Sequence, residues 1–362
     1  MGAGEGGSRQ PARAVLSGQK VVIPDEAEGS QIHVKGYYGK PLSGGGLELD
    51  LMDATYLAES GRIAISSNGK AVAMSELVSL ATRSMPGFEI KYLVYRDIRQ
   101  RGYVIKPGTP PLDFRVLPRG GAPGKAHSKY WIAAISERGI FDAEALMGLM
   151  DSTNRVHKIF LLAVVDEEGD LTYYRVKDIV PKGRLKFSAP ESPADGLVME
   201  DRVLVLEPGD ASALYSSGYY GKMMGSGLQL SLLEAGYLSE TGWLTLRDAQ
   251  TGKKLPWKKF RDAASEAQPD FDLRMRVYKD LKGSGMLVKT GFKYGSHFRV
   301  YEGDPDSTHA RYLVHAIPAD YRSMWAEISR AVRLAHGVRK EILLGRVGKD
   351  EIEYLRLERI RP

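Results

Sequence analysis

The chain has 362 residues, of which 43% are hydrophobic and 27% are charged, and this composition is typical of a soluble globular protein with more than one domain. Cysteine is absent, which excludes disulfides and thiolate metal sites and favours a reducing compartment, the cytoplasm. A net charge of +6 favours an anionic partner such as RNA, and no apolar run reaches the roughly 18 residues of a membrane span.

The sequence predicts a short tail followed by two copies of one unit. Residues 1–13 are rich in glycine and small residues and lack the apolar stretch of a secretion signal, so we expect a disordered tail. The segment Gly36-Tyr-Tyr-Gly-Lys40 returns as Gly218-Tyr-Tyr-Gly-Lys222, at an offset of 182 residues (218 − 36). Two later pairs of blocks follow in the same order at nearly the same offset, namely Tyr95–Gly102 with Tyr278–Gly285 and Asp113–Val116 with His297–Val300. This repeated order indicates a tandem duplication.

The two copies are predicted to be joined by a linker. The first copy covers residues 14–181 and the second residues 201–362, and residues 182–200 contain prolines and polar side chains that suit an exposed linker. Each copy is expected to have a small α/β front domain, about 201–267 in the second copy. A nuclease-like α/β back domain follows, about 268–362 in the second copy. The predicted fold class is therefore α/β (α+β), repeated in tandem.

The elements of the back domain are predicted in the same order in both copies. A helix comes first (89–101; 272–282) and stops near a glycine. Strand-like segments follow at 103–106, 114–117 and 130–135 in the first copy and at 287–289, 298–301 and 312–317 in the second. A last helix leads into apolar runs at 159–165 and 342–347, which are typical of buried strands.

Three residues of the second copy are candidates for chemistry at one end of the predicted sheet. Tyr301 ends a strand, His309 lies in a turn-rich loop, and Lys340 stands where the last helix becomes a strand. Each alone is more often a structural or solvated residue. The helix is predicted to be amphipathic, with a basic face that includes Arg330, Arg333 and Lys340 and a core face formed by Ile328, Val332 and Ala335.

A tyrosine, a histidine and a lysine together can cleave RNA without a metal or another cofactor. The reaction needs a group that removes the proton from the 2′-OH, an acid that protonates the departing 5′-oxygen, and a cation beside the phosphate. Histidine is a natural acid because its ordinary pKa is near 6.5, and lysine supplies a compact positive charge. Because the ordinary pKa of tyrosine is about 10, Tyr301 acts as a base only if nearby cations lower that pKa; otherwise it only orients the 2′-OH.

The first copy does not hold this complete set. The equivalents of the histidine and the lysine are His127 and Lys158, each 182 residues earlier, but the position of Tyr301 is Leu117. The first copy therefore cannot supply the phenol, and we expect it to be structural. Whether its histidine and lysine contact RNA is left open by the sequence.

Two further differences between the copies concern charge. Arg333 corresponds to Asp151, and alignment of the last residues of each copy places Arg359 opposite Asp178. An arginine pair can stack on an unpaired base or bind phosphate, although exposed ion pairs are an equally good interpretation.

The converse difference is an acidic turn near the end of the first copy. It holds Asp166, Glu167, Glu168 and Asp170, where the second copy has the less acidic Gly348-Lys-Asp-Glu351. Such a turn is either a solvated hairpin tip or a loop that docks into a basic groove on another subunit.

Taken together, the motifs resemble the archaeal tRNA-intron endonuclease family over nearly the whole chain beyond the tail. The matching segments are the repeated Gly-Tyr-Tyr-Gly-Lys block, residues 278–285 and 288–295, Phe298–Tyr301, His309 ahead of Tyr312–Val314, and Val332–Lys340. The resemblance implies that Tyr301, His309 and Lys340 are catalytic, and that bulge-helix-bulge precursor tRNA is cut to a 2′,3′-cyclic phosphate and a 5′-hydroxyl.

The resemblance also implies an assembly. Family members place four similar units together, so a chain with two fused units is expected to form a homodimer with one structural and one catalytic copy per chain. The acidic turn at residues 166–170 would dock on the catalytic copy of the other chain. The base-clamping arginines of the family map to Arg333 and, in poorer register, to Arg359, with Arg356 and Arg361 as rivals.

Other functions remain possible at this point. A non-catalytic RNA-binding or assembly subunit of the same fold is disfavoured by the complete Tyr301, His309 and Lys340 set. A metal-dependent nuclease needs clustered carboxylates, and the stretch around Lys340 offers only Glu341. A dehydrogenase is disfavoured because no Gly-x-Gly-x-x-Gly fingerprint stands between a strand and a helix.

Overall fold

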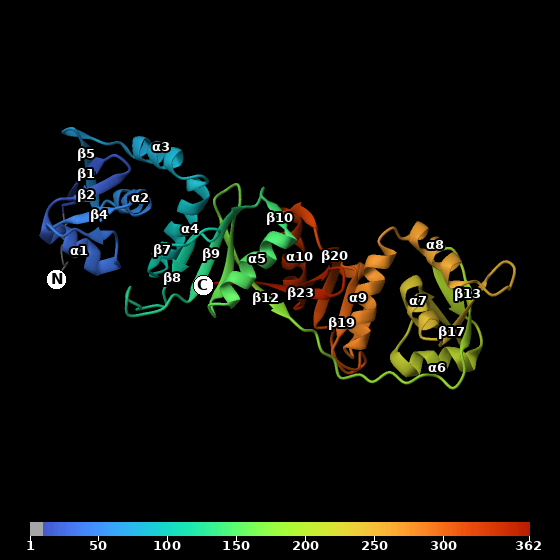
Figure 1. The fold of residues 1–362 in the computed structure, drawn as a ribbon. Coiled ribbons are helices and arrows are strands. Elements are labelled where there is room, and N and C mark those ends of the chain that lie inside the picture. Colours follow the sequence, from blue (N-terminus) through green and yellow to red (C-terminus); the bar gives the residue numbers. More distant parts are fainter. Residues whose placement is uncertain (1–9) are drawn as a thin grey trace, which may run out of the picture. The chain divides into compact units, whose positions relative to one another are not determined.

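The computed structural model describes residues 10–362, and its helices and sheets follow an order that repeats once along the chain (Figure 1). Two compact units are formed, one by residues up to 139, 151–174 and 360–362, the other by residues 140–150 and 175–359. The predicted tail ran to residue 13, but strand β1 already begins at Ala12, and positions 1–9 lie outside the described residues. No helix within residues 10–362 combines the length and the apolar character needed to cross a membrane.

The front domain of the first unit is a mixed sheet with three helices. Its strands are β1 (Ala12–Ser17), β2 (Lys20–Ile23), β3 (Lys40–Pro41), β4 (Leu47–Leu49), β5 (Ile63–Ser67) and β6 (Lys70–Ala71), and its helices are α1 (Glu26–Gly36), α2 (Leu51–Glu59) and α3 (Met74–Ser84). The strand order is β3-β4-β2-β1-β5-β6, in which β1 is antiparallel to β2 and parallel to β5.

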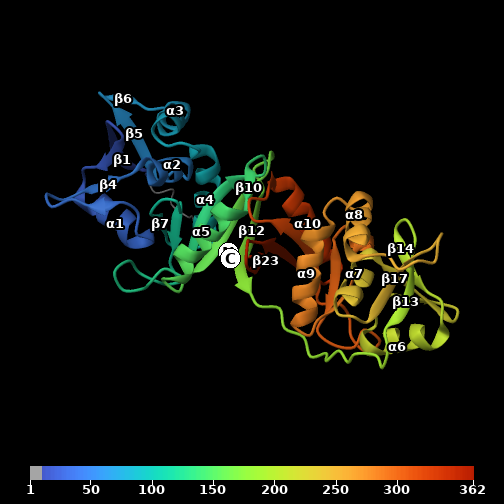
Figure 2. The ribbon, with the colours of Figure 1, turned by 45° about the vertical axis from the view of Figure 1, so that its right-hand side comes forward.

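The front domain of the second unit repeats this sheet. Its strands are β13 (Ala194–Val198), β14 (Arg202–Val205), β15 (Lys222–Met224), β16 (Gly227–Ser231) and β17 (Leu244–Asp248), and its helices are α6 (Pro208–Gly218), α7 (Leu232–Glu240) and α8 (Trp257–Ala267) (Figure 2). The order β15-β16-β14-β13-β17 reproduces β3-β4-β2-β1-β5, with β13 antiparallel to β14 and parallel to β17. The duplication predicted from sequence is confirmed in the strand order itself.

The segment between the copies differs from the predicted exposed linker. Strand β13 occupies 194–198, so the linker ends before residue 194 rather than at 200. Its first part is fixed on the second copy by three backbone hydrogen bonds. They run from Gly183 N to Ser284 O (2.9 Å), from Arg184 N to Glu302 O (2.9 Å) and from Leu185 N to Gly285 O (3.1 Å). The proline and polar composition predicted an exposed linker and did not reveal this attachment.

The back domain of the first copy is built around a helix and a sheet. Its elements are α4 (Phe88–Gln100), β7 (Ile105–Pro107), β8 (Phe114–Val116), β9 (Tyr130–Ser136), β10 (Ile140–Asp142), α5 (Ala143–Asn154), β11 (Ile159–Val165) and β12 (Leu171–Ile179). Strand β8 is antiparallel to both β7 and β9, and β11 is parallel to β9.

The back domain of the second copy has the same plan. Its elements are α9 (Phe271–Gly283), β18 (Leu287–Thr290), the 3-10 turn η1 (Phe292–Tyr294), β19 (Phe298–Tyr301), β20 (Tyr312–Pro318), β21 (Arg322–Met324), α10 (Trp325–Gly337), β22 (Glu341–Val347) and β23 (Ile352–Ile360). The strands run in the order β18-β19-β20-β22-β23, and β20 and β22 are parallel. The short strand β21 pairs with β10, which explains why residues 140–150 belong to the second unit.

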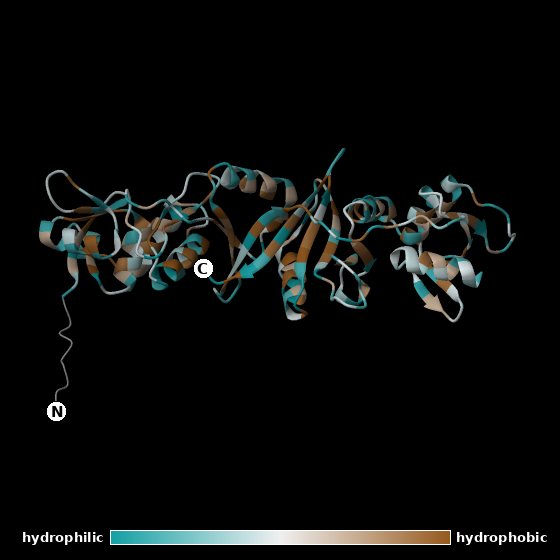
Figure 3. Ribbon diagram, turned by 90° about the horizontal axis from the view of Figure 1, so that it is seen from below, coloured by the Kyte–Doolittle hydropathy of each residue, from teal (hydrophilic) through white to brown (hydrophobic). Residues whose placement is uncertain are grey.

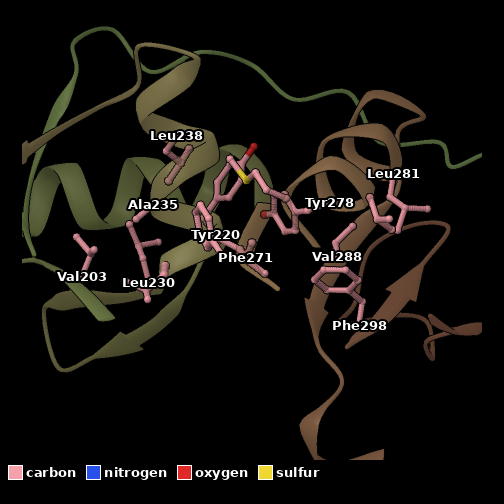
Figure 4. Packing of buried hydrophobic residues seen from close by; sticks show 14 of the residues in the cluster. Val203, Tyr220, Leu230, Ala235, Leu238, Phe271, Tyr278, Leu281, Val288 and Phe298 are labelled. Carbon is pink, nitrogen blue, oxygen red and sulfur yellow. The ribbon is translucent and has the colours of Figure 1, made fainter. Parts of the chain in front are cut away.

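One hydrophobic core joins the front and back domains of the second copy. Figure 4 shows Tyr220 of the front domain beside Phe271 and Tyr278 of the back domain, and all three are buried. Hydrophobic segments follow the strands in Figure 3, as the apolar runs of the sequence predicted. Burying an aromatic or aliphatic side chain contributes about 1.5–3 kcal/mol, so this shared core fixes the two domains to each other.

The repeated Gly-Tyr-Tyr-Gly-Lys block has a structural role at the same boundary. Gly221 lies in the left-handed region (φ +63°), and a β-carbon there would come 2.3 Å from the carbonyl oxygen of Gln229. Its N–H donates to the buried carboxylate of Glu234 (2.9 Å), and its carbonyl accepts from Lys289 (2.7 Å) of the back domain. The first copy repeats the arrangement, because Gly39 N donates to Asp53 (2.7 Å).

Candidate active site

The ends of strands β19, β20 and β22 meet at one end of the sheet in the back domain of the second copy, called the second sheet below. Val300 of β19 is opposite Tyr312 of β20, and Tyr312 is opposite Glu341 of β22. Continuing this register by one residue places Tyr301 and Lys340 in one row across the sheet, two strands apart. Because neighbouring strands lie about 4.8 Å apart, their α-carbons are separated by roughly 10 Å, which long side chains can bridge with a nucleotide between them.

Tyr301 lies in a hydrophobic cluster at the end of β19. It is only 8% exposed and packs with Leu287 and Ala310, against which Leu185 of the linker and Tyr219 also lie. The guanidinium carbon of Arg299 is 5.9 Å from the centre of its ring. The ring is therefore held in place by packing, while one side of it lines a groove described below.

His309 and Lys340 reach the same end of the sheet from a loop and from a helix end. His309 is exposed, in a loop that Asp304 closes by accepting from Thr308 N (3.0 Å) and Thr308 Oγ1 (2.6 Å). Lys340 follows Arg339, whose left-handed backbone (φ 55°) ends the helical segment, and Lys340 N donates to Ala335 O (2.9 Å). The ammonium nitrogen of Lys340 lies 5.6 Å from the ring centre of Tyr294.

Helix α10 differs in one respect from the predicted amphipathic helix. Its core face is confirmed, because Ile328, Val332 and Ala335 are buried. The helix ends at Gly337, however, so Lys340 is not on its basic face but in the connection to β22. Arg333 is exposed on the helix.

The sheet register places Arg359, and not Arg356, in the row that holds Lys340. The pairs Ile342 with Leu357 and Leu343 with Arg356 fix the register of β22 and β23, and continuing it places Arg359 opposite Lys340. Arg359 is exposed there, whereas the guanidinium of Arg356 is three residues further in and already bound to a carboxylate.

The first copy has the same strand register and the same helix-to-strand connection, but it lacks the tyrosine. Val116, Tyr130 and Ile159 are in register as Val300, Tyr312 and Glu341 are in the second copy. The connections match as well: His157 has φ 54° where Arg339 has 55°, and Lys158 N donates to Thr153 O (3.0 Å). The register thus supports the predicted equivalences and places Leu117, which is buried, where Tyr301 stands.

The acidic turn of the first copy is exposed and well ordered by its own hydrogen bonds. It connects β11 with β12, and Asp166 accepts from Glu168 N (3.0 Å) and Asp170 N (2.9 Å). Glu167 is paired with Arg138 (2.5 Å), and both side chains are more than half exposed. Glu168 and Asp170 are also exposed.

A groove of about 1180 Å³ lies between the front and back domains of the second copy, beside Tyr301. Its basic side chains are Arg202, Lys222, Lys289 and Arg299, and its acidic ones are Asp201, Glu234 and Asp306. The corresponding cavity of the first copy is smaller, about 410 Å³. Sequence reasoning did not identify this groove, although Lys289 and its counterpart Lys106 end matching strand-like segments in the two copies.

Two half-buried histidines lie further along the same strands of the second copy, His297 just before β19 and His315 within β20. Burial and the nearby Arg274 lower the pKa of His297 and of His315 to about 4, and their ring centres are 5.2 Å apart. His297 Nδ1 accepts from Ala316 N (3.0 Å), so the ring is held neutral. Among residues 10–362, no group of three or more His, Cys, Asp or Glu is placed to hold a metal ion.

Both domain types of a known family match both copies of the chain. A model of the catalytic C-terminal domain of the tRNA intron endonucleases matches residues 88–173 and 271–354, and one of their N-terminal domain matches residues 12–78 and 194–261. The chain belongs to the tRNA intron endonuclease family. The two domain types of the family coincide with the back and front domains described above.

Relatives in the tRNA intron endonuclease family align over almost the whole chain. A protein named tRNA-splicing endonuclease from Methanosarcina barkeri is 41% identical over 350 residues, which cover 96% of this chain and 99% of the relative. Proteins of the same name from Methanococcoides burtonii and Halobacterium salinarum are 40% and 33% identical, each over 96% of this chain. The resemblance read from the motifs is confirmed, and these relatives are archaeal.

Proposed function

We propose that the chain is a tRNA-splicing endonuclease that cuts precursor tRNA at both splice sites of a bulge-helix-bulge motif. Tyr301, His309 and Lys340 are its catalytic residues. The observation that carries the proposal is the register of the second sheet, which gathers the segments bearing these three side chains at one end, whereas Leu117 occupies the position of the tyrosine in the first sheet. The names of the relatives support the class of substrate.

Cleavage proceeds by attack of the 2′-OH on the adjacent phosphorus. The O2′–P bond forms and the P–O5′ bond breaks, which leaves a 2′,3′-cyclic phosphate and a 5′-hydroxyl. Tyr301 removes or orients the 2′-OH proton, His309 donates a proton to the departing O5′, and Lys340 stabilises negative charge on the non-bridging oxygens. The buried ring of Tyr301 and the exposed loop of His309 suit these roles, because the first must be fixed and the second must recover its proton from solvent.

Two arginines are proposed to hold the RNA. Arg359, opposite Lys340 in the sheet register, is placed to stack on an unpaired base, and the exposed Arg333 is its proposed partner. Because bulged nucleotides are unpaired, recognition depends on the shape of the RNA more than on its sequence.

The active assembly is a homodimer in which each first copy is structural. The acidic turn of one chain, Asp166 to Asp170, docks into the groove beside Tyr301 of the other chain, whose lining holds four basic side chains, Lys222 and Arg299 among them, and three acidic ones. The turn is exposed and preformed, so docking costs little conformational entropy. The absence of cysteine is in keeping with a cytoplasmic location.

Cleavage of a labelled bulge-helix-bulge RNA in EDTA tests the proposal. The wild-type chain should produce the cyclic phosphate, and Tyr301→Phe, His309→Ala and Lys340→Ala should each slow single-turnover cleavage by roughly 10²–10⁴-fold. His127→Ala is the matched control in the first copy and should cleave like wild type. Loss of cleavage in EDTA would refute metal-free chemistry, and binding without cleavage by the wild type would favour a non-catalytic RNA-binding subunit.

A further inference from the structure

A row of ion pairs crosses the same end of the second sheet. Arg311, which precedes β20, binds Glu302 through Nη1 (2.5 Å) and Glu341 through Nε (3.2 Å). Glu341 also binds Arg356 of β23 (2.7 Å). The row therefore links β19, β20, β22 and β23 through side chains, next to the residues proposed to be catalytic.

The two carboxylates of this row are direct neighbours of catalytic positions. Glu302 follows Tyr301 in the chain, and Glu341 follows Lys340. The sheet register places Arg311 between Tyr301 and Lys340, one strand from each. A single guanidinium thus connects the residue after the tyrosine to the residue after the lysine.

The first copy lacks both carboxylates. Its register places Pro118 at the position of Glu302 and Ile159 at the position of Glu341, while Lys129 stands at the position of the arginine. The copy without the tyrosine therefore also lacks the acidic partners that the arginine uses. The strand pairing around these positions is the same in both copies, so the loss of the two carboxylates is a difference in side chains at the end of the sheet that carries the proposed chemistry.

Stability alone does not account for the row. The side chains of Arg311, Glu302 and Glu341 are 45%, 36% and 35% exposed. Ion pairs at such exposure contribute little to the free energy of folding, typically below about 1 kcal/mol each. Geometry is a better explanation, because the planar guanidinium binds two carboxylates in fixed directions and a lysine does not.

We infer that Arg311 is a positioning residue, which sets the spacing between Tyr301 and Lys340 through Glu302 and Glu341. The expected effect on RNA cleavage rests on the proposed function, whereas the expected shift in the positions of Tyr301 and Lys340 does not. An error of about 1 Å in the placement of reacting groups can lower a rate by about a hundredfold. Removing any member of the row should therefore slow the chemical step and leave RNA affinity nearly unchanged.

Single-turnover cleavage at saturating RNA tests this inference with the variants Arg311→Gln, Arg311→Lys, Glu302→Gln and Glu341→Gln. We expect roughly ten- to hundredfold slower cleavage for the glutamine variants, dissociation constants within about twofold of wild type, and only partial rescue by lysine. The double variant Glu302→Gln/Arg311→Gln should be no slower than the worse single variant. Arg261→Gln removes an ion pair with Asp272, whose side chains are 52% and 53% exposed, and serves as the control.

A direct RNA contact by Arg311 would give a different pattern. In that case only the arginine variants would weaken binding, the salt dependence of affinity would fall by about one charge, and the glutamate variants would cleave normally. That pattern would overturn the inference. Crystal structures of wild type and Arg311→Gln without RNA provide a readout independent of activity: unchanged Tyr301 and Lys340 positions would refute it, even if the wild type failed to cut any RNA and the proposed function itself were wrong.

Discussion

The Gly183→Ala substitution is predicted to detach the linker from the second copy. A β-carbon at this position would lie 1.9 Å from the carbonyl oxygen of Gly285, a separation at which the backbone must move. The obstacle is backbone rather than the end of a flexible side chain, so no rotamer change can relieve it. The residues that must shift carry the three hydrogen bonds that hold the linker, and they include Leu185, which packs beside Tyr301.

The magnitude follows from these contacts. Three hydrogen bonds at a net value of about 1 kcal/mol each, with about 1 kcal/mol for the half-buried leucine, give an upper limit of roughly 4 kcal/mol for complete detachment. Partial adjustment of the linker would reduce this value, so we expect a loss of about 2–4 kcal/mol in the free energy of unfolding. Cleavage should also slow, because Tyr301 loses one wall of its packing.

Urea denaturation measures the first effect and single-turnover cleavage the second. Gly283→Ala is the matched control, because a β-carbon there meets nothing within 4 Å and the helix favours alanine over glycine. If the free energy of unfolding of Gly183→Ala is within about 0.5 kcal/mol of the wild-type value and cleavage is equally fast, the linker only connects the two copies and the reasoning is refuted. Leu185→Ala separates the two effects, since it spares the backbone hydrogen bonds and removes only the contact with the tyrosine.

Two further predictions concern pH and assembly. The folded chain lowers the pKa of His297 and His315 from 6.5 to about 4. Above pH 6.5 both rings are neutral in the folded and unfolded chain. As pH falls from 6.5 toward 4, only the unfolded chain binds protons there, so the free energy of unfolding should fall by up to about 3 kcal/mol per ring. Urea unfolding at pH 7 and pH 4.5 checks this, and a His297→Asn/His315→Asn variant should lose most of the difference. Replacing the four acidic residues of turn 166–170 by amides should shift sedimentation from dimer to monomer and abolish cleavage. An unchanged dimer would refute docking of the acidic turn.

The fold was largely predictable because the chain contains its own internal comparison. Matching blocks such as Tyr95–Gly102 and Tyr278–Gly285 predicted the duplication, and the apolar run 159–165 coincides with β11. Element ends were less predictable. Lys340 lies between helix and strand as predicted, but the helical pattern also counts it on the basic face of a helix that stops three residues earlier. The left-handed backbone at Arg339 leaves no signal in helical periodicity.

The sequence does not reveal the attachment of the linker or the row of ion pairs, for a different reason. Gly183 and Leu185 lie among prolines and polar residues, and local composition does not reveal that a segment pairs with a backbone about 100 residues away. The carboxylates Glu302 and Glu341 were visible in the sequence, as was their absence from the first copy. Their meaning depends on strand register, which decides that Arg311 lies between them.

The two copies keep the contacts that hold their domains together and differ in side chains at the end of the sheet that carries the proposed chemistry. The links between front and back domains are kept with related chemistry, since Lys289 donates to the carbonyl of Gly221 in the second copy and Lys106 donates to the carbonyl of Tyr37 in the first. At the end of the sheet, a tyrosine and two carboxylates of the second copy are replaced by Leu117, Pro118 and Ile159. Two of these three residues are hydrophobic, and none can donate to or accept from a phosphate through its side chain. The exposed His127 survives because an isolated histidine on a loop costs the fold nothing, so its presence is no argument that the first copy cuts RNA.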